Sequence, residues 1–404
     1  MPPTPQTVVT GLGIVSSGGT GTDATWQSLL AGRPTARAMP LTAEQTPLPT
    51  CRVPDHDSAR RVSGAWARRT DRYSQLAFTA ADEALAAARL DPGCWEPTRV
   101  AVVMGTALAG VATLQSQITH QIRGRKVSPL TIPMFAPNML PGQLALRLNA
   151  TGPNLAVATA CASGATAIGI AAQMIDAGTC DIALAGGSEA PIAPVVTAAF
   201  TRMNALAAPR ADPGAASRPF DADRDGFVLG EGAAVLVLEH SVHAAARKAT
   251  VLARLAGFGA TADSHHITDP HPDGAGLSQA IAIALRQAGA SPLDVDHVNA
   301  HATGTLKGDA IEAALLERLF GRHATVTAPK GTLGHTLGAA GAIEAALTVR
   351  AVAEQQVPPT ANLDRPDFDL DFVTGTPRSQ RIRLALTNSS GFGGQNTALA
   401  FTSS

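Results

Sequence analysis

Lysine is nearly absent from this sequence. The 404 residues include only Lys126, Lys248, Lys307 and Lys330, and arginine carries the remaining basic charge. The formal net charge of −1 gives no bulk attraction to nucleic acid or to a membrane surface. No uncharged apolar run is both long enough and free of glycine-rich turns to predict a membrane span. Each of the few lysines is therefore a candidate for a specific role.

Aromatic residues and cysteines are also scarce. Aromatics make up 4% of the chain and hydrophobic residues 45%, so a large core must consist mainly of Ala, Val, Leu and Ile. The four cysteines (Cys51, Cys94, Cys161 and Cys180) show no C-x-x-C spacing and are too few for a disulfide scaffold. We therefore expect a reducing, cytoplasmic environment. Residues 1–7 lack the basic and apolar segments of a signal peptide.

Short apolar stretches alternate with alanine-rich helical segments along the whole chain. This alternation predicts an α/β protein whose helices pack between sheets as well as outside them. In residues 73–90, for example, Ala77, Phe78 and Ala81 share one face of a predicted helix. The pattern recurs after residue 245, which predicts two related halves, residues 1–245 and 246–404, with no flexible tether between them.

Residues 157–178, V-A-T-A-C-A-S-G-A-T-A-I-G-I-A-A-Q-M-I-D-A-G, together with the apolar run N-L-A-V-A-T-A (residues 154–160) that leads to Cys161, predict a buried strand, a tight turn and a buried helix. Cys161 lies at the turn, where the helix begins. Unpaired N–H groups and the positive end of the helix dipole favour a thiolate there, and the thiolate is the nucleophilic form. The alternative is a small buried cysteine that packs as an apolar residue.

Three later segments place polar or glycine-flanked residues where an apolar strand ends. They contain His301 in N-A-H-A-T-G-T-L-K-G-D, Lys330 and His335 in P-K-G-T-L-G-H-T, and Phe392 in N-S-S-G-F-G-G-Q-N. Strand ends of one sheet converge on one face, so these residues and Cys161 form a candidate reacting set. Taken singly, the histidines fit helix caps and the lysine a surface ion pair. Zinc is a further alternative, but the spacing is not that of a compact site and a fourth ligand is missing.

The order of these motifs resembles one enzyme family. T-A-C-A-S-G, N-A-H-A-T-G-T-x-x-G-D, P-K-G-T-L-G-H-T-x-G-A-A-G and G-F-G-G-Q-N follow one another, with R-P-F-D-A-D-R-D-G-F-V-L-G-E-G after the first. The chain is similar, essentially end to end, to β-ketoacyl-acyl-carrier-protein synthases of the elongating type. The resemblance implies a thiolase-like fold, with two fused, pseudo-duplicated halves in αβαβα layers, and a dimer. It implies no cofactor, because the substrates are carried on the phosphopantetheine of an acyl carrier protein.

The resemblance also implies a role for each motif residue. Cys161 would accept the acyl chain, and His301 and His335 would stabilise the enolate that forms when malonyl-carrier protein loses CO2. The N–H groups of Cys161 and Phe392 would form the oxyanion hole, and Phe392 would gate the acyl chain. Decarboxylation places negative charge on one oxygen, so preorganised donors in a dry site lower the barrier by several kcal/mol. Which imidazole takes part in thiol activation stays open.

Supporting residues follow from the same resemblance. Lys330 would orient His335, with Glu344 as its partner. Four residues match positions that line the acyl tunnel or reach across the dimer: Leu108, Thr131, Phe200 and Ser390. Five match regions that face the acidic carrier protein: Arg68, Arg69, Arg125, Lys126 and Arg202. The alternatives are ordinary core packing for the first set and a solvated basic face for the second.

Two departures from the fatty-acid enzymes favour a particular pathway. Ser390 stands where a second phenylalanine is usual, and Thr131 is small where a bulky aromatic is common. With the lysine-poor composition, these departures predict a type II polyketide ketosynthase, acting as a homodimer or paired with a chain-length-factor-like homologue. The alternatives are a housekeeping fatty-acid synthase and a non-catalytic chain-length-setting subunit, which typically lacks the cysteine. Thiolases and coenzyme-A-using synthases fit less well because they lack the second imidazole, here His335.

Overall fold

The computed structural model describes residues 6–40, 47–54, 62 and 64–403. Strands of the first half form one side of the main sheet, with antiparallel pairing from β1 to β9 to β7 and parallel pairing from β7 to β5 to β6. In spatial order from the edge, these strands are β6 (Asn154–Val157), β5 (Val100–Gly105), β7 (Ile182–Glu189), β9 (Gly232–His240) and β1 (Thr7–Ser16).

The second half repeats this succession of antiparallel and then parallel pairs. Its strands, again in spatial order, are β10 (Ala253–Ala262), β17 (Gln395–Thr402), β16 (Leu384–Gly391), β11 (His297–Asn299), β12 (Thr325–Thr327) and β14 (Asp371–Phe372). The two sets join into one sheet where β1 pairs with β10 at Val8 and Val9. The predicted division near residue 245 falls in α10 (Ser241–Ala246), and its exact position stays a prediction.

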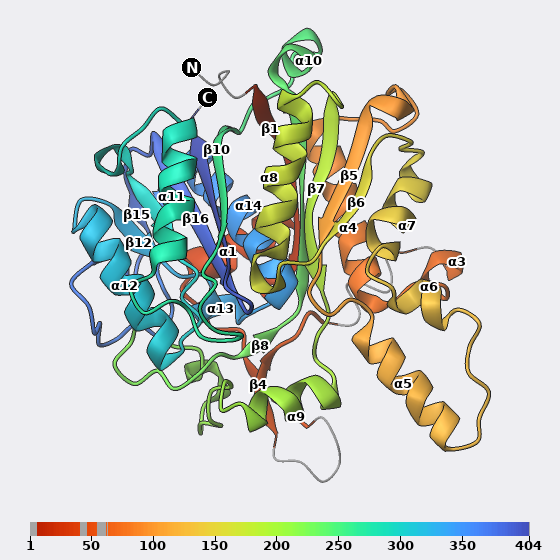
Figure 1. The fold of residues 1–404 in the computed structure, drawn as a ribbon, viewed down its shortest axis with the longest axis horizontal. Coiled ribbons are helices and arrows are strands. Elements are labelled where there is room, and N and C mark those ends of the chain that lie inside the picture. The colour runs from red at the N-terminus through yellow and green to blue at the C-terminus, as the bar shows by residue number, and fades with distance from the viewer. Residues whose placement is uncertain (1–5, 41–46, 55–61, 63, 404) are drawn as a thin grey trace.

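Two helices form the middle layer. α8 (Ser163–Asp176) packs against β5 and β7, α14 (Ala340–Glu354) packs against β16 and β9, and the two helices pack against each other (Figure 1). Small residues allow this close approach: a Cβ added at Gly164 would lie 2.7 Å from Ala342, and one added at Gly341 would lie 2.8 Å from Ala165. The alanine and glycine content of these segments is therefore a packing requirement.

Outer helices complete the αβαβα layering and confirm the thiolase-like fold. α4 (Arg72–Ala88) and α7 (Met139–Leu148) cover the first-half strands, and α11 (Ala275–Gln287) and α12 (Leu306–Phe320) cover those of the second half (Figure 1). The predicted apolar face of residues 73–90 is confirmed, since Ala77, Phe78 and Ala81 are buried.

The prediction of a buried strand before Cys161 is wrong. β6 is the edge strand of the sheet, and Asn154, Leu155 and Ala156 are exposed. Most of this strand is apolar, but the rest of the chain leaves three of its four residues exposed, so its composition wrongly indicated burial. β6 also ends at Val157, and an irregular segment leads from there to the cysteine.

Two helices extend from the body beside this edge (Figure 1). α5 (Val111–Ile122) has no buried residue, and α6 (Thr131–Phe135) follows it. The Thr113 hydroxyl donates to the buried Asp71 carboxylate at the base of α5, and the Tyr73 hydroxyl donates to the carbonyl of Ala136 at 3.1 Å. The two helices are therefore anchored at their ends and open to solvent along their length.

The remaining elements are shorter. They are α1 (Thr22–Leu30), α3 (Gly64–Ala67), α9 (Pro194–Arg202), α13 (Lys330–Leu333), β2 (Gly19–Thr20), β3 (Arg37–Met39), β4 (Leu48–Cys51), β8 (Leu229–Gly230), β13 (Gln356–Val357) and β15 (Arg378–Ser379). Within the described ranges, no helix is long and apolar enough to cross a membrane.

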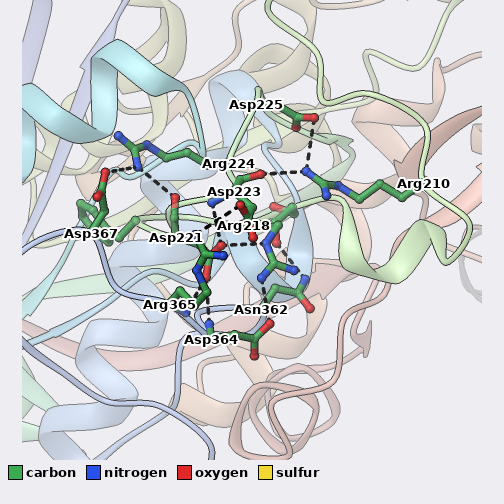
Figure 2. A network of polar contacts seen from close by, with 12 residues as sticks. Arg210, Arg218, Asp221, Asp223, Arg224, Asp225, Asn362, Asp364, Arg365 and Asp367 are labelled. Atoms are coloured by element: carbon green, nitrogen blue, oxygen red, sulfur yellow. Dashed lines mark hydrogen bonds and ion pairs between the residues drawn. The ribbon is translucent and has the colours of Figure 1, made fainter.

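The R-P-F-D-A-D-R-D segment joins the two halves through a polar network centred on Asp221 (Figure 2). The buried Asp221 carboxylate accepts hydrogen bonds from the Arg218 guanidinium at 3.0 Å and from the backbone N–H groups of Asp364 and Arg365 at 2.9 and 2.8 Å. Burial opposes its ionisation, but these donors hold the pKa of Asp221 below its ordinary value. Arg224 extends the network by donating to the Asp221 carbonyl and to Asp367. This motif therefore holds the two halves together through hydrogen bonds and ion pairs.

Candidate active site

Cys161 lies in a tight turn between β6 and α8. Ala160 has a left-handed backbone (φ 49°), and the Ser163 hydroxyl donates to the Ala160 carbonyl at 2.6 Å while accepting from the N–H of Thr159 at 2.9 Å. A non-glycine residue in this conformation is strained, and such strain concentrates at functional turns. The turn presents the thiol at the start of α8, as the sequence predicts.

His335 is the histidine that contacts the thiol. Its Nε2 atom lies 3.1 Å from Cys161 Sγ, and its ring packs edge-on against Phe227 with centroids 5.3 Å apart. Gly334 has a left-handed backbone (φ 67°), which turns the chain after α13, and the His335 N–H donates to the Val228 carbonyl at 2.7 Å. The turn and this bond fix the ring against the sulfur.

His301 lies beside His335, with ring centroids 5.4 Å apart. It follows β11, and its own N–H and that of Ala302 donate to the buried Glu312 carboxylate at 2.8 and 2.7 Å. Two imidazoles from different strand ends thus converge next to one thiol, as the shared position of these motifs predicts.

Lys330 contacts His301, so the prediction that it orients His335 is wrong. Lys330 Nζ donates to the His301 carbonyl at 2.5 Å and lies 3.4 Å from its Nδ1 atom. The physical reason is strand order: β12, which precedes Lys330, pairs in parallel with β11, which precedes His301, so the two residues emerge side by side. The predicted Lys330–Glu344 contact is present as a buried ion pair.

Burial sets the protonation states of this group. It lowers the pKa of both His301 and His335 well below the ordinary value, and the Lys330 charge acts in the same direction. Burial also raises the pKa of Cys161 to about 12, against the opposing effects of Lys330 and of the Phe392 N–H, which donates to the sulfur. The expectation of a stabilised thiolate is wrong, because desolvation outweighs the helix start. The resting site contains a neutral thiol and two neutral imidazoles.

The hairpin between β16 and β17 brings Phe392 to the thiol. A Cβ at Gly391 would lie 2.8 Å from the Thr159 carbonyl oxygen and 3.0 Å from the Cys161 nitrogen, so only glycine permits this approach. Gly393 and Gly394 have left-handed backbones (φ 81° and 73°). The Phe392 side chain is 38% exposed, and its ring centroid lies 6.4 Å from that of Phe200.

Two of the four predicted tunnel residues pack beside the cysteine. Leu108 and Phe200 join Cys161 in one apolar cluster. Ser390 lies nearby and donates to Asn396 Oδ1 at 2.8 Å. Thr131 lies on α6, where its hydroxyl donates to the Ser128 carbonyl, and it belongs neither to this cluster nor to the cavity described next. A contact of Thr131 across a dimer stays a prediction.

A cavity of about 250 Å³ opens onto both histidines. Phe227, His335, His301 and Glu312 line its inner part, and the Phe392 hairpin lines one side. Its other walls include residues of a loop and of the start of α12: Asp263, Thr268, Asp269, Pro270, Thr303, Thr305, Lys307 and Gly308.

Sequence reasoning missed the buried carboxylates that support the site. Glu189 accepts from the N–H groups of Ala107 at 2.5 Å and Gly338 at 3.2 Å, and burial raises its pKa to about 7. Glu312 accepts from the amide of Asn388 at 2.6 Å in addition to its bonds near His301. Glu189 ends the apolar strand β7, so the strand-end pattern that identified His301 could have found it. Glu312 has no such signal.

The five predicted carrier-facing residues are all exposed. Arg68 and Arg69 follow α3, Arg125 and Lys126 follow α5, and Arg202 ends α9, so they belong to three separate parts of the first half. In the described part of the chain, no group of three or more His, Cys, Asp or Glu side chains is arranged to hold a metal ion.

Comparisons with known proteins agree with this geometry. Residues 5–244 match the N-terminal domain of β-ketoacyl synthases, and residues 252–364 match the C-terminal domain. The chain is 40% identical over 407 residues to 3-oxoacyl-[acyl-carrier-protein] synthase 2 of Synechocystis, covering 98% of this chain and 97% of that protein. It is also 40% identical over 414 residues to the putative polyketide beta-ketoacyl synthase 1 of Streptomyces cyaneus, covering 99% and 98%.

Solved structures give the same result. One is a type II polyketide synthase acyl-carrier protein in complex with its ketosynthase bound to the hexaketide, with TM-score 0.90 and 30% identity over 99% of this chain and 100% of that one. Another is a β-ketoacyl synthase from Burkholderia phymatum, with TM-score 0.92 and 32% identity over 99% of both chains. The chain therefore belongs to the β-ketoacyl synthase family and is an acyl-transferring condensing enzyme.

Proposed function

We propose that this enzyme condenses malonyl-acyl-carrier protein with an acyl chain held on Cys161, by decarboxylative Claisen chemistry in type II polyketide biosynthesis. The observation that carries the proposal is the 3.1 Å contact between His335 Nε2 and Cys161 Sγ, with His301 beside it on the same cavity. A thiol and two neutral imidazoles supply the nucleophile and the donors that the two half-reactions need.

Loading uses Cys161 and His335. The neutral imidazole accepts the thiol proton as sulfur attacks the acyl thioester, and it returns that proton to the departing pantetheine thiolate. The N–H groups of Cys161 and Phe392 hold the oxyanion of the tetrahedral intermediate. Because the pKa of Cys161 is raised to about 12, proton transfer must accompany attack rather than precede it.

Decarboxylation uses the two imidazoles as donors. The Lys330 ammonium lies at Nδ1 of His301, which leaves the His301 proton on Nε2. Donation from His335 requires the tautomer with its proton on Nε2, so the ring changes tautomer after loading has returned the proton it accepted there. Both rings then donate to the malonyl thioester carbonyl and stabilise the enolate as the carboxylate leaves as CO2. The enolate carbon then attacks the acyl-Cys161 carbonyl, forming the new C–C bond and releasing the thiolate. A charged imidazolium is not required, which fits the lowered pKa of both histidines.

The carrier of both substrates would be an acyl carrier protein, with no dissociable cofactor. Structural relatives include a ketosynthase bound to its acyl-carrier protein and a ketosynthase/chain length factor pair. The spread of exposed basic side chains at Arg68, Arg69, Arg125, Lys126 and Arg202 fits an acidic partner. We place the enzyme in the cytoplasm, since its four cysteines are unpaired.

A polyketide role is favoured over fatty-acid elongation by Ser390. Its hydroxyl binds Asn396 at the edge of the cavity, where a second aromatic ring would occupy more space and repel polar groups of an oxygenated chain. Fatty-acid elongation is the second candidate, since relatives of equal identity bear that name. Turnover of matched saturated acyl and poly-β-keto acyl carrier substrates separates them: preference for the saturated chain would reject the polyketide assignment.

The exposed edge of β6 supports a dimer. Asn154, Leu155 and Ala156 leave an unpaired strand edge, and Ile132 and Leu146 add exposed apolar surface nearby. Antiparallel pairing with a second chain would cover this edge. Native mass measurement, with and without the neighbouring gene product, decides between a homodimer and a heterodimer, and a stable monomer would contradict both.

The direct test of function is acyl transfer to the cysteine. Incubation with acyl-carrier protein should add the acyl mass to Cys161, and the Cys161→Ala variant should remain unmodified. Loading of the Cys161→Ala variant would reject the assignment. Decarboxylation of malonyl-carrier protein that survives His335→Ala would reject the role of that imidazole. Retention of Cys161 and both histidines already argues against a non-catalytic chain-length-setting subunit.

A further inference from the structure

One wall of the cavity is a ladder of alternate residues that runs from the catalytic histidine to solvent. His301, Thr303, Thr305 and Lys307 all line the cavity. Their burial decreases in that order, from the buried His301 through the half-buried threonines to the exposed Lys307. The two threonine hydroxyls lie 3.1 Å apart. A chain that reaches the histidines from solvent along this wall therefore passes the lysine first.

Lys307 is the one lysine or arginine among the described residues that line the cavity. It is also one of only four lysines in the sequence. Its ammonium forms an ion pair with Asp269, which also lines the cavity, and the two side chains are 57% and 42% exposed. The pair therefore spans the outer end of the cavity, between the first turn of α12 and the loop of residues 263–274.

That loop is joined to the Phe392 hairpin by three hydrogen bonds. The Gly393 N–H donates to the Ile267 carbonyl at 2.8 Å, and the Asp263 N–H donates to the Gly394 carbonyl at 2.9 Å. The Asn396 amide donates to Asp263 Oδ1 at 2.7 Å. Any change at Asp269 is thus connected through one loop to the hairpin that covers Cys161.

We propose that Lys307 binds the phosphate of the phosphopantetheine arm, and that it exchanges the Asp269 carboxylate for this phosphate when the carrier docks. The proposal rests on the proposed function and adds a phosphate-recognition residue to it. An ion pair between two half-exposed side chains contributes little stability, so a competing anion displaces it readily. Phosphate offers several strong acceptor oxygens to an ammonium. The exchange is non-covalent and frees Asp269, which loosens the loop that contacts the hairpin.

The test compares substrates with and without the phosphate. Acyl-phosphopantetheine and acyl-pantetheine thioesters share the reacting thioester and the amides and differ in the phosphate alone. Lys307→Ala should lower kcat/KM for the phosphorylated thioester about tenfold, the loss expected for one charge-assisted hydrogen bond. Any change in kcat/KM for the other thioester should be smaller, since that substrate has no phosphate for Lys307 to bind. Lys307→Arg should recover part of the loss, and Asp269→Asn should lower KM for the phosphorylated substrate by removing the competing carboxylate.

The matched control is Arg322→Ala. Arg322 forms an exposed ion pair with Asp369 just beyond α12 and away from the cavity, so its loss should change neither substrate's kinetics. Equal losses on both thioesters, or no loss on either, would overturn the phosphate assignment. If Lys307→Ala and Asp269→Asn change kcat/KM in the same direction, the ion pair acts only by holding the loop in place, and the phosphate assignment is overturned as well.

A binding measurement separates this proposal from the proposed function. Calorimetric titration with free phosphopantetheine and with pantetheine requires no turnover. Wild-type enzyme should bind the phosphorylated compound more tightly, and Lys307→Ala should abolish the difference. Failure of acyl transfer to Cys161 would reject the proposed function without affecting this result. An undiminished phosphate preference in Lys307→Ala would reject the present inference alone.

Discussion

The buried Lys330–Glu344 pair allows stability and catalysis to be separated in one experiment. Both side chains are at least 97% buried (2% and 3% exposed). The pKa of Glu344 is raised to about 7 by burial even with Lys330 beside it. We predict that Lys330→Met lowers the free energy of unfolding by about 3–5 kcal/mol, because it leaves an uncompensated carboxylate in the interior.

The double variant Lys330→Met/Glu344→Gln removes both charges together. Replacement of a buried ion pair by neutral groups of similar size is often close to neutral in stability. We therefore expect the double variant to recover most of the lost free energy of unfolding, measured by urea denaturation at pH 7.5. Glu344→Gln alone should also be destabilising, since it leaves the Lys330 ammonium without its carboxylate.

Condensation should not recover in the double variant. Lys330 donates to the His301 carbonyl and lies at its Nδ1 atom, and neither contact can be made by methionine. Malonyl decarboxylation, measured as CO2 release with the acyl chain already on Cys161, should stay reduced by about 10²-fold, as for the loss of one preorganised oxyanion donor. Acyl loading should be less affected, since His335 contacts the sulfur directly. A stable double variant with full decarboxylation would refute the role of Lys330, and an unstable one would refute the pairing argument.

Three further predictions use other parts of the fold. Gly391→Ala should lower kcat about 10²-fold and leave the protein folded, because its Cβ would lie 2.8 Å from the Thr159 oxygen and displace the Phe392 N–H. The control Gly142→Ala, whose Cβ would have no atom within 4 Å, should keep full activity. A wild-type kcat in Gly391→Ala would contradict this prediction. Burial lowers the pKa of His297 to about 4, so between pH 6.5 and 4 the unfolded chain takes up a proton that the folded one does not, and stability falls as pH falls. Urea denaturation at pH 5 and pH 7 should show that His297→Gln removes about 2 kcal/mol of this loss, and an unchanged pH dependence would count against it. Asp221→Asn should lower the free energy of unfolding, measured in urea, by about 2–4 kcal/mol, since an amide cannot accept from all four donors around that carboxylate. The control Asp369→Asn, at an exposed ion pair, should change it by under about 0.5 kcal/mol. Similar losses in both variants would refute the role of Asp221 in holding the two halves together.

The convergence of the reacting residues was predictable because it requires only that each residue lies at the end of a strand in a shared sheet. Cys161, His301, Lys330 and Phe392 each follow or lie between strands, and residues that leave one edge of a sheet must meet there. The partner of Lys330 was not predictable in the same way. It depends on which two strands are adjacent, and β11 and β12 are neighbours that bring Lys330 to His301.

Burial explains the other differences between prediction and structure. β6 has the composition of a buried strand, yet the chain leaves its edge open, and composition cannot report what a second chain would cover. Glu312 and Glu189 read as solvent-facing residues in sequence, yet each is buried and accepts several hydrogen bonds. The strand-end pattern marks the position of Glu189 but not its donors, because the number of donors that converge on a buried carboxylate is a property of tertiary structure.

The protonation state of Cys161 follows from the same competition. The partial charge of a helix start and the Lys330 ammonium favour the thiolate, whereas its removal from much of the surrounding water disfavours it. The result is a pKa raised to about 12 and a resting thiol with little thiolate at neutral pH. Reactivity then requires His335 at 3.1 Å to take the proton during attack, and it requires a bound thioester whose carbonyl can use the Phe392 N–H. A thiolate-dependent reagent should therefore label Cys161 slowly at neutral pH, while acyl transfer from the carrier proceeds.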